Sequence, residues 1–272
     1  MTRDPRELLA RAAAAGVATG PVTGELRVGV DLGTASCVLV VLAGDEPVHV
    51  DSRPSGALRD GVVVDFARAI ETVRSLREVA QAAVGAELPA AATAYPPCIP
   101  VPDARACTYV CESAGFTDVT LVDEVSAAQA TLGVRDGVVV DVGGGSTGVG
   151  VFRDGCLERL DDRPGGGHHL DLVLAGALGL RLEDAEPYKR SHPDEVLPIL
   201  VPGLERIAEN VRALTASGSG AGDGSDLPLH LAGGALMIPG AGDVLARYLE
   251  RPVVTYPHAL LITPLGIARC AP

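Results

Sequence analysis

Short runs of hydrophobic, β-forming residues follow the first 25 residues of the chain. The runs cover residues 26–31, 37–42 and 47–50, and Gly44-Asp45 supplies a turn between the last two. Strands that are joined by such short connections pair in antiparallel fashion. The pattern therefore predicts an antiparallel meander.

Helical periodicity begins after this meander. Asp65 can cap a helix that ends near Gly85, and its apolar residues recur at three-residue steps, namely Ile70, Val73, Leu76 and Val79. Strands and helices then alternate: strand 90–95, helix 103–114, strand 119–122 and helix 126–132. Alternation of this kind is typical of an α/β fold.

The opening pattern of strand, glycine turn and strand recurs in the middle of the chain. Residues 137–142 form an apolar run, glycines follow, and residues 149–152 resume the strand pattern. Two β-turn-β units of one design indicate an internal repeat and a chain of two halves. Later helices are predicted at 170–178 and 204–214, and the Gly/Ser/Asp run 217–226 is typical of a surface loop.

The first 25 residues are predicted to be a tail and linker. An Ala/Arg/Leu run after an early proline predicts a short helix over residues 5–15, with Leu8 and Leu9 on one side, and residues 16–24 are expected to be the linker. The helix either packs on or frays from the rest of the chain, or it is a docking helix for another protein.

Composition narrows the classes of function. The 272 residues are enough for one large domain or two ordinary ones, and no apolar stretch reaches the length of a membrane span. The net charge of −13 opposes binding to nucleic acid, because a phosphate backbone repels an acidic surface. Cys107 and Cys111 lie one helical turn apart but lack the second pair that structural zinc needs, so we favour small buried hydrophobic residues as their role. The irregular cysteines and the lack of a signal-like start predict a reducing, cytoplasmic setting without membrane or nucleic-acid partners.

Candidate chemistry is concentrated in the two glycine turns. In the first, Asp31 ends an apolar strand and Gly33, Thr34 and Ala35 follow. The backbone N–H groups of such a turn can converge on an anion, beside a carboxylate that can hold the water shell of a metal ion. A hairpin with an Asp-stabilised turn is the alternative.

The second turn repeats this arrangement with more glycines. Asp141 is followed by the run Gly143, Gly144, Gly145, Ser146 and Thr147. Glycines in a row cost stability unless the backbone needs a positive φ or a ligand approaches closely. Two turns of this design predict a two-part phosphate clamp, in which the carboxylates of Asp31 and Asp141 can hold the water shell of a metal ion.

Two further segments can belong to the same site. Asp123 and Glu124 end a strand just before a helix of small residues, so they either cap that helix or place Glu124 where it orients a water molecule. Gly233 and Gly234 follow another strand, as expected where a backbone packs flat against a base or ribose.

Together these motifs resemble the phosphate, connecting and adenosine motifs of the actin/DnaK/sugar-kinase ATPase superfamily, over most of residues 26–270. The segment 166–171 resembles the GGEDFD stretch of DnaK-type proteins. Within the superfamily, the compact size, residues 185–190 and the terminal run 262–268 resemble the EutJ family, chaperone-like proteins of ethanolamine utilisation.

The resemblance implies an α/β fold of two ribonuclease H-like, actin-like ATPase lobes, with mixed sheets flanked by helices and a nucleotide cleft between the lobes. A first lobe of residues 26–135 and 257–272 and a second lobe of residues 136–256 would follow the tail 1–25. It implies ATP or ADP with Mg²⁺ as cofactor and Asp31, Glu124 and Asp141 as catalytic residues. It also places Thr34, Ser146 and Thr147 near phosphates, and Glu186 and Lys189 near the adenosine. The implied partners are ethanolamine-utilisation enzymes or microcompartment proteins, in the cytoplasm or at a bacterial microcompartment.

Two departures from the superfamily bear on activity. DnaK-type chaperones place a lysine of the first lobe near the γ-phosphate, whereas the only lysine here is Lys189 in the second half, so we expect slow hydrolysis at most. Met237 stands where those chaperones have an arginine that stacks on adenine, which predicts a lower nucleotide affinity. Our leading hypothesis is a nucleotide-driven switch that a partner protein senses. The alternatives are a small-molecule kinase or phosphatase with Asp123 or Glu124 as base, a filament protein, and a non-hydrolysing adaptor.

Overall fold

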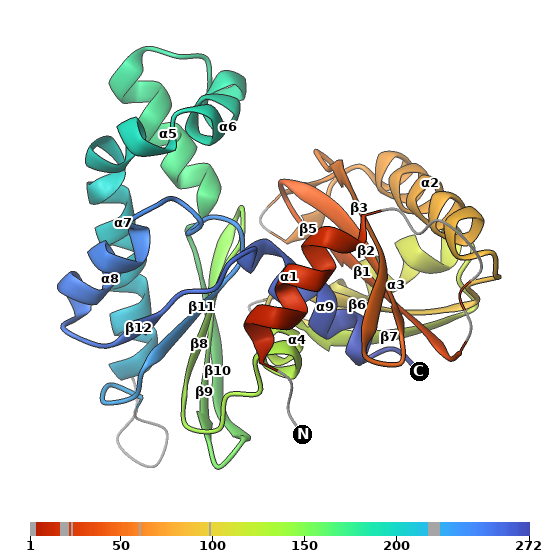
Figure 1. Cartoon of the computed structure of the whole chain (residues 1–272). Coiled ribbons are helices and arrows are strands. Elements are labelled where there is room, and N and C mark those ends of the chain that lie inside the picture. The colour runs from red at the N-terminus through yellow and green to blue at the C-terminus, as the bar shows by residue number, and fades with distance from the viewer. Residues whose placement is uncertain (1–3, 17–21, 23, 60, 98, 217–223) are drawn as a thin grey trace. The chain divides into compact units, whose positions relative to one another are not determined.

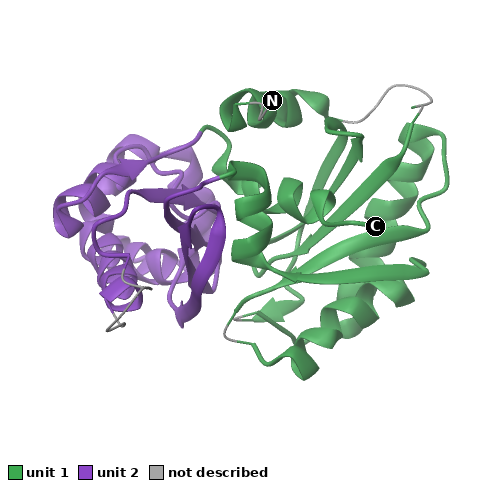
Figure 2. Cartoon of the chain, turned by 90° about the horizontal axis from the view of Figure 1, so that it is seen from below, with its two compact units in different colours: residues 1–133, 257–272 green, residues 134–256 purple. Residues whose placement is uncertain are grey.

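The chain folds into two compact units. The computed structural model describes residues 4–16, 22, 24–59, 61–97, 99–216 and 224–272 (Figure 1). Unit 1 comprises Met1–Gly133 and Pro257–Pro272, and unit 2 comprises Val134–Tyr256 (Figure 2). Each unit is built around a five-stranded sheet. Among the described residues, no helix combines the length and apolar character needed to span a membrane.

The sheet of unit 1 contains antiparallel and parallel strands. Its strands are β1 (Leu26–Leu32), β2 (Ser36–Ala43), β3 (Glu46–Pro54), β6 (Ala90–Tyr95) and β7 (Asp118–Asp123). They are ordered β3-β2-β1-β6-β7, with β1 to β3 antiparallel and with β6 and β7 parallel to β1. The predicted meander is therefore confirmed.

Helices cover both faces of this sheet (Figure 1). One face packs on α2 (Phe66–Val84) and α3 (Val101–Ser113), and the other on α9 (Ile262–Arg269) with α4 (Glu124–Leu132) beside it. The alternation of β1 explains both contacts. Val28 and Val30 lie in the core with α2 and α3, while a Cβ atom on Gly29 would lie 2.4 Å from the backbone nitrogen of Ala268 in α9.

Smaller elements complete unit 1. They are the hairpin β4 (Leu58–Arg59) and β5 (Val62–Val63), the 3₁₀ turn η1 (Ala259–Leu261) and the N-terminal helix α1 (Pro5–Ala15). Helix α1 packs on β3 with Leu8, Leu9 and Ala12 buried. Of the two interpretations of the tail, the structure thus shows a helix whose apolar face is already covered by its own unit.

Unit 2 repeats the sheet of unit 1 strand for strand. Its strands are β8 (Gly137–Val142), β9 (Ser146–Arg153), β10 (Cys156–Pro164), β11 (Leu229–Ala232) and β12 (Val253–Val254). They are ordered β10-β9-β8-β11-β12, again with an antiparallel meander followed by two parallel strands. The internal repeat predicted from the two glycine turns is confirmed and extends to the whole sheet.

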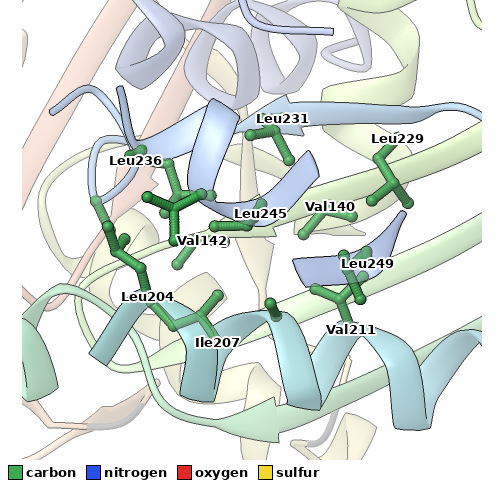
Figure 3. Close-up of a cluster of buried hydrophobic side chains, with 14 of the residues drawn as sticks. Val140, Val142, Leu204, Ile207, Val211, Leu229, Leu231, Leu236, Leu245 and Leu249 are labelled. Atoms are coloured by element: carbon green, nitrogen blue, oxygen red, sulfur yellow. The ribbon is translucent and has the colours of Figure 1, made fainter. Parts of the chain in front are cut away.

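One face of the unit 2 sheet carries its hydrophobic core. The helices are α5 (Gly167–Leu178), α6 (Leu182–Ser191), α7 (Pro193–Ala216) and α8 (Ala241–Leu249). Val140 and Val142 of β8 point toward Leu204 and Ile207 of α7 and toward Leu245 of α8 (Figure 3). Because alternate residues of a strand face opposite sides, Asp141 lies on the other face from Val140 and Val142.

Several elements differ from the prediction. Strand β10 and helix α6 were not predicted, since β10 is rich in charged residues and α6 contains Pro187. Helix α7 has 24 residues and begins at Pro193 instead of 204, because tertiary packing of Val196 and Leu200 outweighs two internal prolines. Helix α3 begins two residues earlier than predicted, α5 three residues earlier, and α8 follows Gly233-Gly234 only after a loop. Most of the predicted 217–226 loop lies outside the described residues.

Candidate functional site

The turn of unit 1 is closed by two backbone hydrogen bonds. Gly33 N donates to Ser36 O at 3.1 Å, and Ser55 N, just after β3, donates to Ala35 O at 3.1 Å. Among the described residues, the amides of Thr34 and Ala35 donate to no acceptor. The turn therefore offers two N–H groups to a ligand while one of its carbonyl groups is bonded within the unit.

The turn of unit 2 makes the same two bonds. Gly143 N donates to Ser146 O at 3.1 Å, and Gly165 N, just after β10, donates to Gly145 O at 2.9 Å. Within the described part of the chain, the amides of Gly144 and Gly145 likewise have no acceptor. The two glycine turns therefore share the two hydrogen bonds that close them.

The N-terminus of α5 supports the unit 2 turn. Gly167 N donates to Gly143 O at 2.9 Å and His168 N to Gly144 O at 2.8 Å. A Cβ atom on Gly166 would lie 2.4 Å from Gly143 O, so only glycine allows this approach. The carbonyl groups of all the turn glycines are thus occupied, and the N–H groups that remain define the ligand-binding side of the turn.

The two hydroxyl residues after the glycines have different surroundings. Thr147 is fully buried, and its Oγ1 donates to the carbonyl of Gly165 at 2.6 Å. Its hydroxyl therefore ties β9 to the segment that supports the turn. Ser146 is half-buried, and its carbonyl closes the turn.

Asp141 lies beside the turn and against the loop that follows β11. Only 7% of its surface is exposed, and β8 pairs it with Gly148 and with Ala232. Gly233 has a φ of +85°, and a Cβ atom there would lie 2.6 Å from Asp141 Oδ1. Unit 2 therefore brings Asp141, the glycine turn and Gly233 together at the carboxyl end of β8, and Gly234 continues from there.

Asp31 and Glu124 act on the same buried thiol in unit 1. Burial, together with the negative charges of Glu124 and Asp31, raises the pKa of Cys107 to about 12. Both carboxylates therefore lie within electrostatic range of one point in the core. Asp123 caps helix α4, which is one of the two roles that the sequence left open. Its Oδ1 accepts a hydrogen bond from Ser126 N at 2.7 Å.

Lys189 and Glu186 form an ionic cluster on α6. Lys189 Nζ lies 2.6 Å from Asp171 Oδ1 on α5 and 2.5 Å from Glu186 Oε2, and Arg190 Nε lies 2.6 Å from Glu186 Oε1. Only 7% of Lys189 is exposed.

The pKa values of the two carboxylates in this cluster, Asp171 and Glu186, are shifted in opposite directions. Burial and the neighbouring Glu186 raise the pKa of Asp171 and together outweigh Lys189, which lowers it. Burial also opposes the charge of Glu186, but the hydrogen bonds from Lys189 and Arg190 outweigh it and lower the pKa. Asp171 follows Gly167 by about one helical turn, so the cluster links α6 to the helix that supports the glycine turn.

Sequence reasoning assigned no role to the support of the turns. A repeated D-x-R-P tetrapeptide, at 51–54 and 161–164, ends β3 and β10 and directly precedes Ser55 and Gly165. This repeat could have revealed the two supporting segments from sequence alone. Asp171 also escaped assignment, although it closes the segment that resembles GGEDFD.

In unit 1 the residue equivalent to Gly166 is Gly56, and the side chain of Arg68 lies beside it. Gly56 has a φ of +68°, and a Cβ atom there would lie 2.9 Å from the guanidinium of Arg68. Arg68 belongs to the first turn of α2 and makes no ion pair with any residue that the structure describes. An arginine therefore lies beside the segment that supports the first turn, in the unit that has no lysine.

Comparison with known proteins identifies the family. The family model of the MreB/Mbl proteins matches residues 52–173. The ethanolamine utilization protein EutJ of Salmonella typhimurium is 38% identical over 245 residues, which cover 89% of this chain and 85% of that protein. The chain belongs to the EutJ family. The EutJ protein of Escherichia coli K12 is similar to the same extent.

Solved structures give the same fold. The crystal structure of EutJ from Carboxydothermus hydrogenoformans superposes with a TM-score of 0.88 at 38% identity and covers 97% of both chains. MreB5 of Spiroplasma citri bound to ADP superposes with a TM-score of 0.73 at 17% identity, covering 89% of this chain and 94% of that one. The predicted EutJ membership and actin-like fold are confirmed.

Proposed function

We propose that this EutJ family protein is an ATP-binding switch that acts in ethanolamine utilisation. The observation that carries the proposal is the repetition of one turn in both units. Each turn follows an aspartate, is closed by the same hydrogen bonds and keeps two amides without an acceptor among the described residues. Backbone amides gathered in this way suit a phosphate group.

The residues of the two turns fit ATP with Mg²⁺. The amides of Thr34, Ala35, Gly144 and Gly145 bind phosphate oxygens, while Gly33 and Gly143 close the turns. Asp31 and Asp141 accept hydrogen bonds from water ligands of Mg²⁺, an ion that keeps several waters when it binds phosphates. The metal neutralises phosphate charge when bound. MreB5 of Spiroplasma citri, which shares the fold, has been solved with ADP and with AMPPNP.

Unit 2 provides the residues for the nucleoside. Gly233 and Gly234 let the backbone lie flat against it, and Glu186 and Lys189 border it from α6. The ion pair of Lys189 with Asp171 ties this border to the helix that holds the phosphate turn. Met237, with 42% of its surface exposed, offers an apolar side chain in place of a stacking arginine.

Hydrolysis is slow in this proposal. Glu124 orients the attacking water, and Arg68 supplies positive charge where related chaperones use a lysine. A guanidinium on a side chain that is exposed and held by no ion pair among the described residues is a less ordered partner for a γ-phosphate than a buried lysine. The engagement of Asp123 as a helix cap removes one of the two residues that could serve as the base of a small-molecule kinase.

The switch acts on proteins of ethanolamine degradation. The relatives that establish the family are named for ethanolamine utilisation, which supports its enzymes or microcompartment proteins as partners in a cytoplasmic setting. ATP and ADP differ in the γ-phosphate, so this phosphate is the group through which binding distinguishes the two nucleotides and can shift the protein between two states.

Calorimetric titration with ATP and Mg²⁺ tests the proposal. Asp141→Asn keeps the shape of the side chain and removes its charge, so we expect the affinity to fall about tenfold or more with Mg²⁺ and to change little without it. Asp136→Asn is the matched control, because Asp136 lies just before the other end of β8 and caps a hairpin there. Unmeasurable binding to the unmodified protein, or equal loss in both variants, would contradict the proposal.

A further inference from the structure

Unit 1 carries an open groove between α3 and the edge of its sheet. The groove has a volume of about 420 Å³ and is lined by Leu121 of β7 and by one stripe of α3, namely Val101, Arg105, Thr108, Tyr109 and Glu112. The α3 residues recur at helical spacing, so a single face of the helix borders the strand. None of them belongs to the proposed nucleotide site.

The groove lies within a patch of exposed apolar side chains. Val101 is 55% exposed and Tyr109 57% exposed, and the ring of Phe66 meets that of Tyr109 edge-on with centroids 6.0 Å apart. Val62 and Val64, in and after β5, are exposed as well, and β5 contacts α3. Large apolar side chains that gather on a surface in this way mark binding sites.

Strand β7 is an open edge. It ends the order β3-β2-β1-β6-β7, and among the described residues it pairs with β6 alone. Its outer side therefore presents unpaired N–H and C=O groups, which an added strand can satisfy and a docked helix cannot. The groove thus joins an apolar hollow to a free strand edge.

Two charged residues of the α3 stripe lie on either side of Tyr109. Arg105 and Glu112 are exposed and make no ion pair or side-chain hydrogen bond with any residue that the structure describes. They are seven residues apart, or about 10 Å along the helix, with Tyr109 between them. Residues i and i+4 of a strand lie on one face about 13 Å apart, which long side chains can match.

We propose that this groove binds an extended segment of a partner protein, which adds to β7 as a strand. The segment carries an acidic, an apolar and a basic residue at alternate positions, which meet Arg105, Tyr109 and Glu112. A second copy of this chain is a poorer occupant. Antiparallel pairing of two β7 strands would place Asp118 opposite Asp123, and like charges that face each other across strands repel.

The test uses a defined peptide with this pattern, the acetylated and amidated heptapeptide Thr-Glu-Thr-Ile-Thr-Lys-Thr, titrated against the full-length protein by isothermal titration calorimetry. We expect saturable binding that falls about tenfold when the isoleucine is replaced by aspartate. N-methylation of alternate peptide nitrogens, in two complementary sets, tests strand addition. One set should abolish binding and the other should preserve it, because only alternate N–H groups face β7. Equal behaviour of the two sets, or absence of binding, would overturn the proposal.

Charge reversal tests the groove itself. Arg105→Glu should weaken binding of the peptide about tenfold. A second peptide, in which lysine replaces the glutamate, should restore binding to this variant. Arg247→Glu, an equal charge change at an exposed position of α8, is the matched control. An equal effect of both variants would refute the assignment. ATP binding should be unchanged in Arg105→Glu, so failure here is distinguishable from failure of the proposed function.

Discussion

Single residues hold the two turns in place, and Gly233 shows how closely. It meets both the carboxylate of Asp141 and the carbonyl of Val142 from β8, with no room for a side chain between them. Close packing at the glycines was predictable, since a run of glycines after a buried strand indicates close approach of a backbone or ligand. Which segments approach was not, because the contact joins residues far apart in the chain.

Replacing Gly233 by alanine separates backbone strain from collision. Gly233→Ala should lower the free energy of unfolding by about 2–3 kcal/mol and also weaken ATP binding, because the new Cβ would lie 2.3 Å from Val142 O. Gly155→Ala is the control, with a φ of +81° and nothing within 4 Å of the added atom. Gly155→Ala should lower the free energy of unfolding, measured by urea denaturation, by about 1 kcal/mol. It should leave ATP binding, measured by calorimetry, unchanged. Equal costs for the two variants would show that the collision is relieved.

Two histidines, the buried His49 and the half-buried His230, predict a dependence of stability on pH. Burial lowers the pKa of both His49 and His230, while near His49 the charge of Asp51 opposes this and that of Arg53 adds to it. The unfolded chain then binds a proton more readily than the folded one. Stability should therefore be full above about pH 6.5 and fall as the pH drops through the interval below it.

The two histidines should respond differently to substitution. Both ring nitrogens of His49 lack a partner within the described residues, so His49→Leu should raise the free energy of unfolding by about 1 kcal/mol and reduce its pH dependence. His230→Leu should lower stability at neutral pH, because Nδ1 of His230 lies 2.7 Å from the hydroxyl of Tyr256. Urea titrations at about pH 7 and about pH 5.5 measure both effects. Destabilisation by His49→Leu would show that its ring nitrogens are satisfied in solution.

At the scale of elements, the sequence predicts what periodicity can report. The meander, α2 and its caps at Asp65 and Gly85, and β6 follow from local pattern alone. Strand β10 does not, because it lies at a sheet edge and its residues are mostly exposed and charged. The predicted helix 204–214 is shorter than α7, because prolines normally end a helix. In the structure, packing against the core keeps the residues around both prolines helical.

The link between α5 and α6 depends on a buried cation. Lys189→Met should lower the free energy of unfolding by about 3 kcal/mol, because it leaves Asp171 and Glu186 together without their shared partner. Arg181→Met, on the residue before the same helix, removes only exposed ion pairs to Glu183 and Asp184 and should change stability little. Adding Asp171→Asn to Lys189→Met should recover part of the loss. Thermal unfolding measures the stability of these variants. Equal stability of Lys189→Met and Arg181→Met would contradict a buried cluster.

At the scale of the whole molecule, one design is used twice. The pairs Asp31 and Asp141, Ser36 and Ser146, and Pro54 and Pro164 are all separated by the same interval of the chain. Sequence could predict the repeat because glycine turns stand out, and family resemblance supplied the ligand. The sequence could not predict the hydrogen bonds that orient the amides of the turns. These bonds are donated by Ser55 and Gly165, in segments without candidate functional residues.

Hydrogen exchange measured by mass spectrometry tests the central claim, that ATP binds at both glycine turns. ATP with Mg²⁺ should slow exchange at residues 33–36 and 143–146 together, with the same dependence on concentration, while the hairpin turns at 44–45 and 154–155 stay unchanged. ADP should protect the two turns less. Protection of only one turn, or of neither at saturating ATP, would contradict the account.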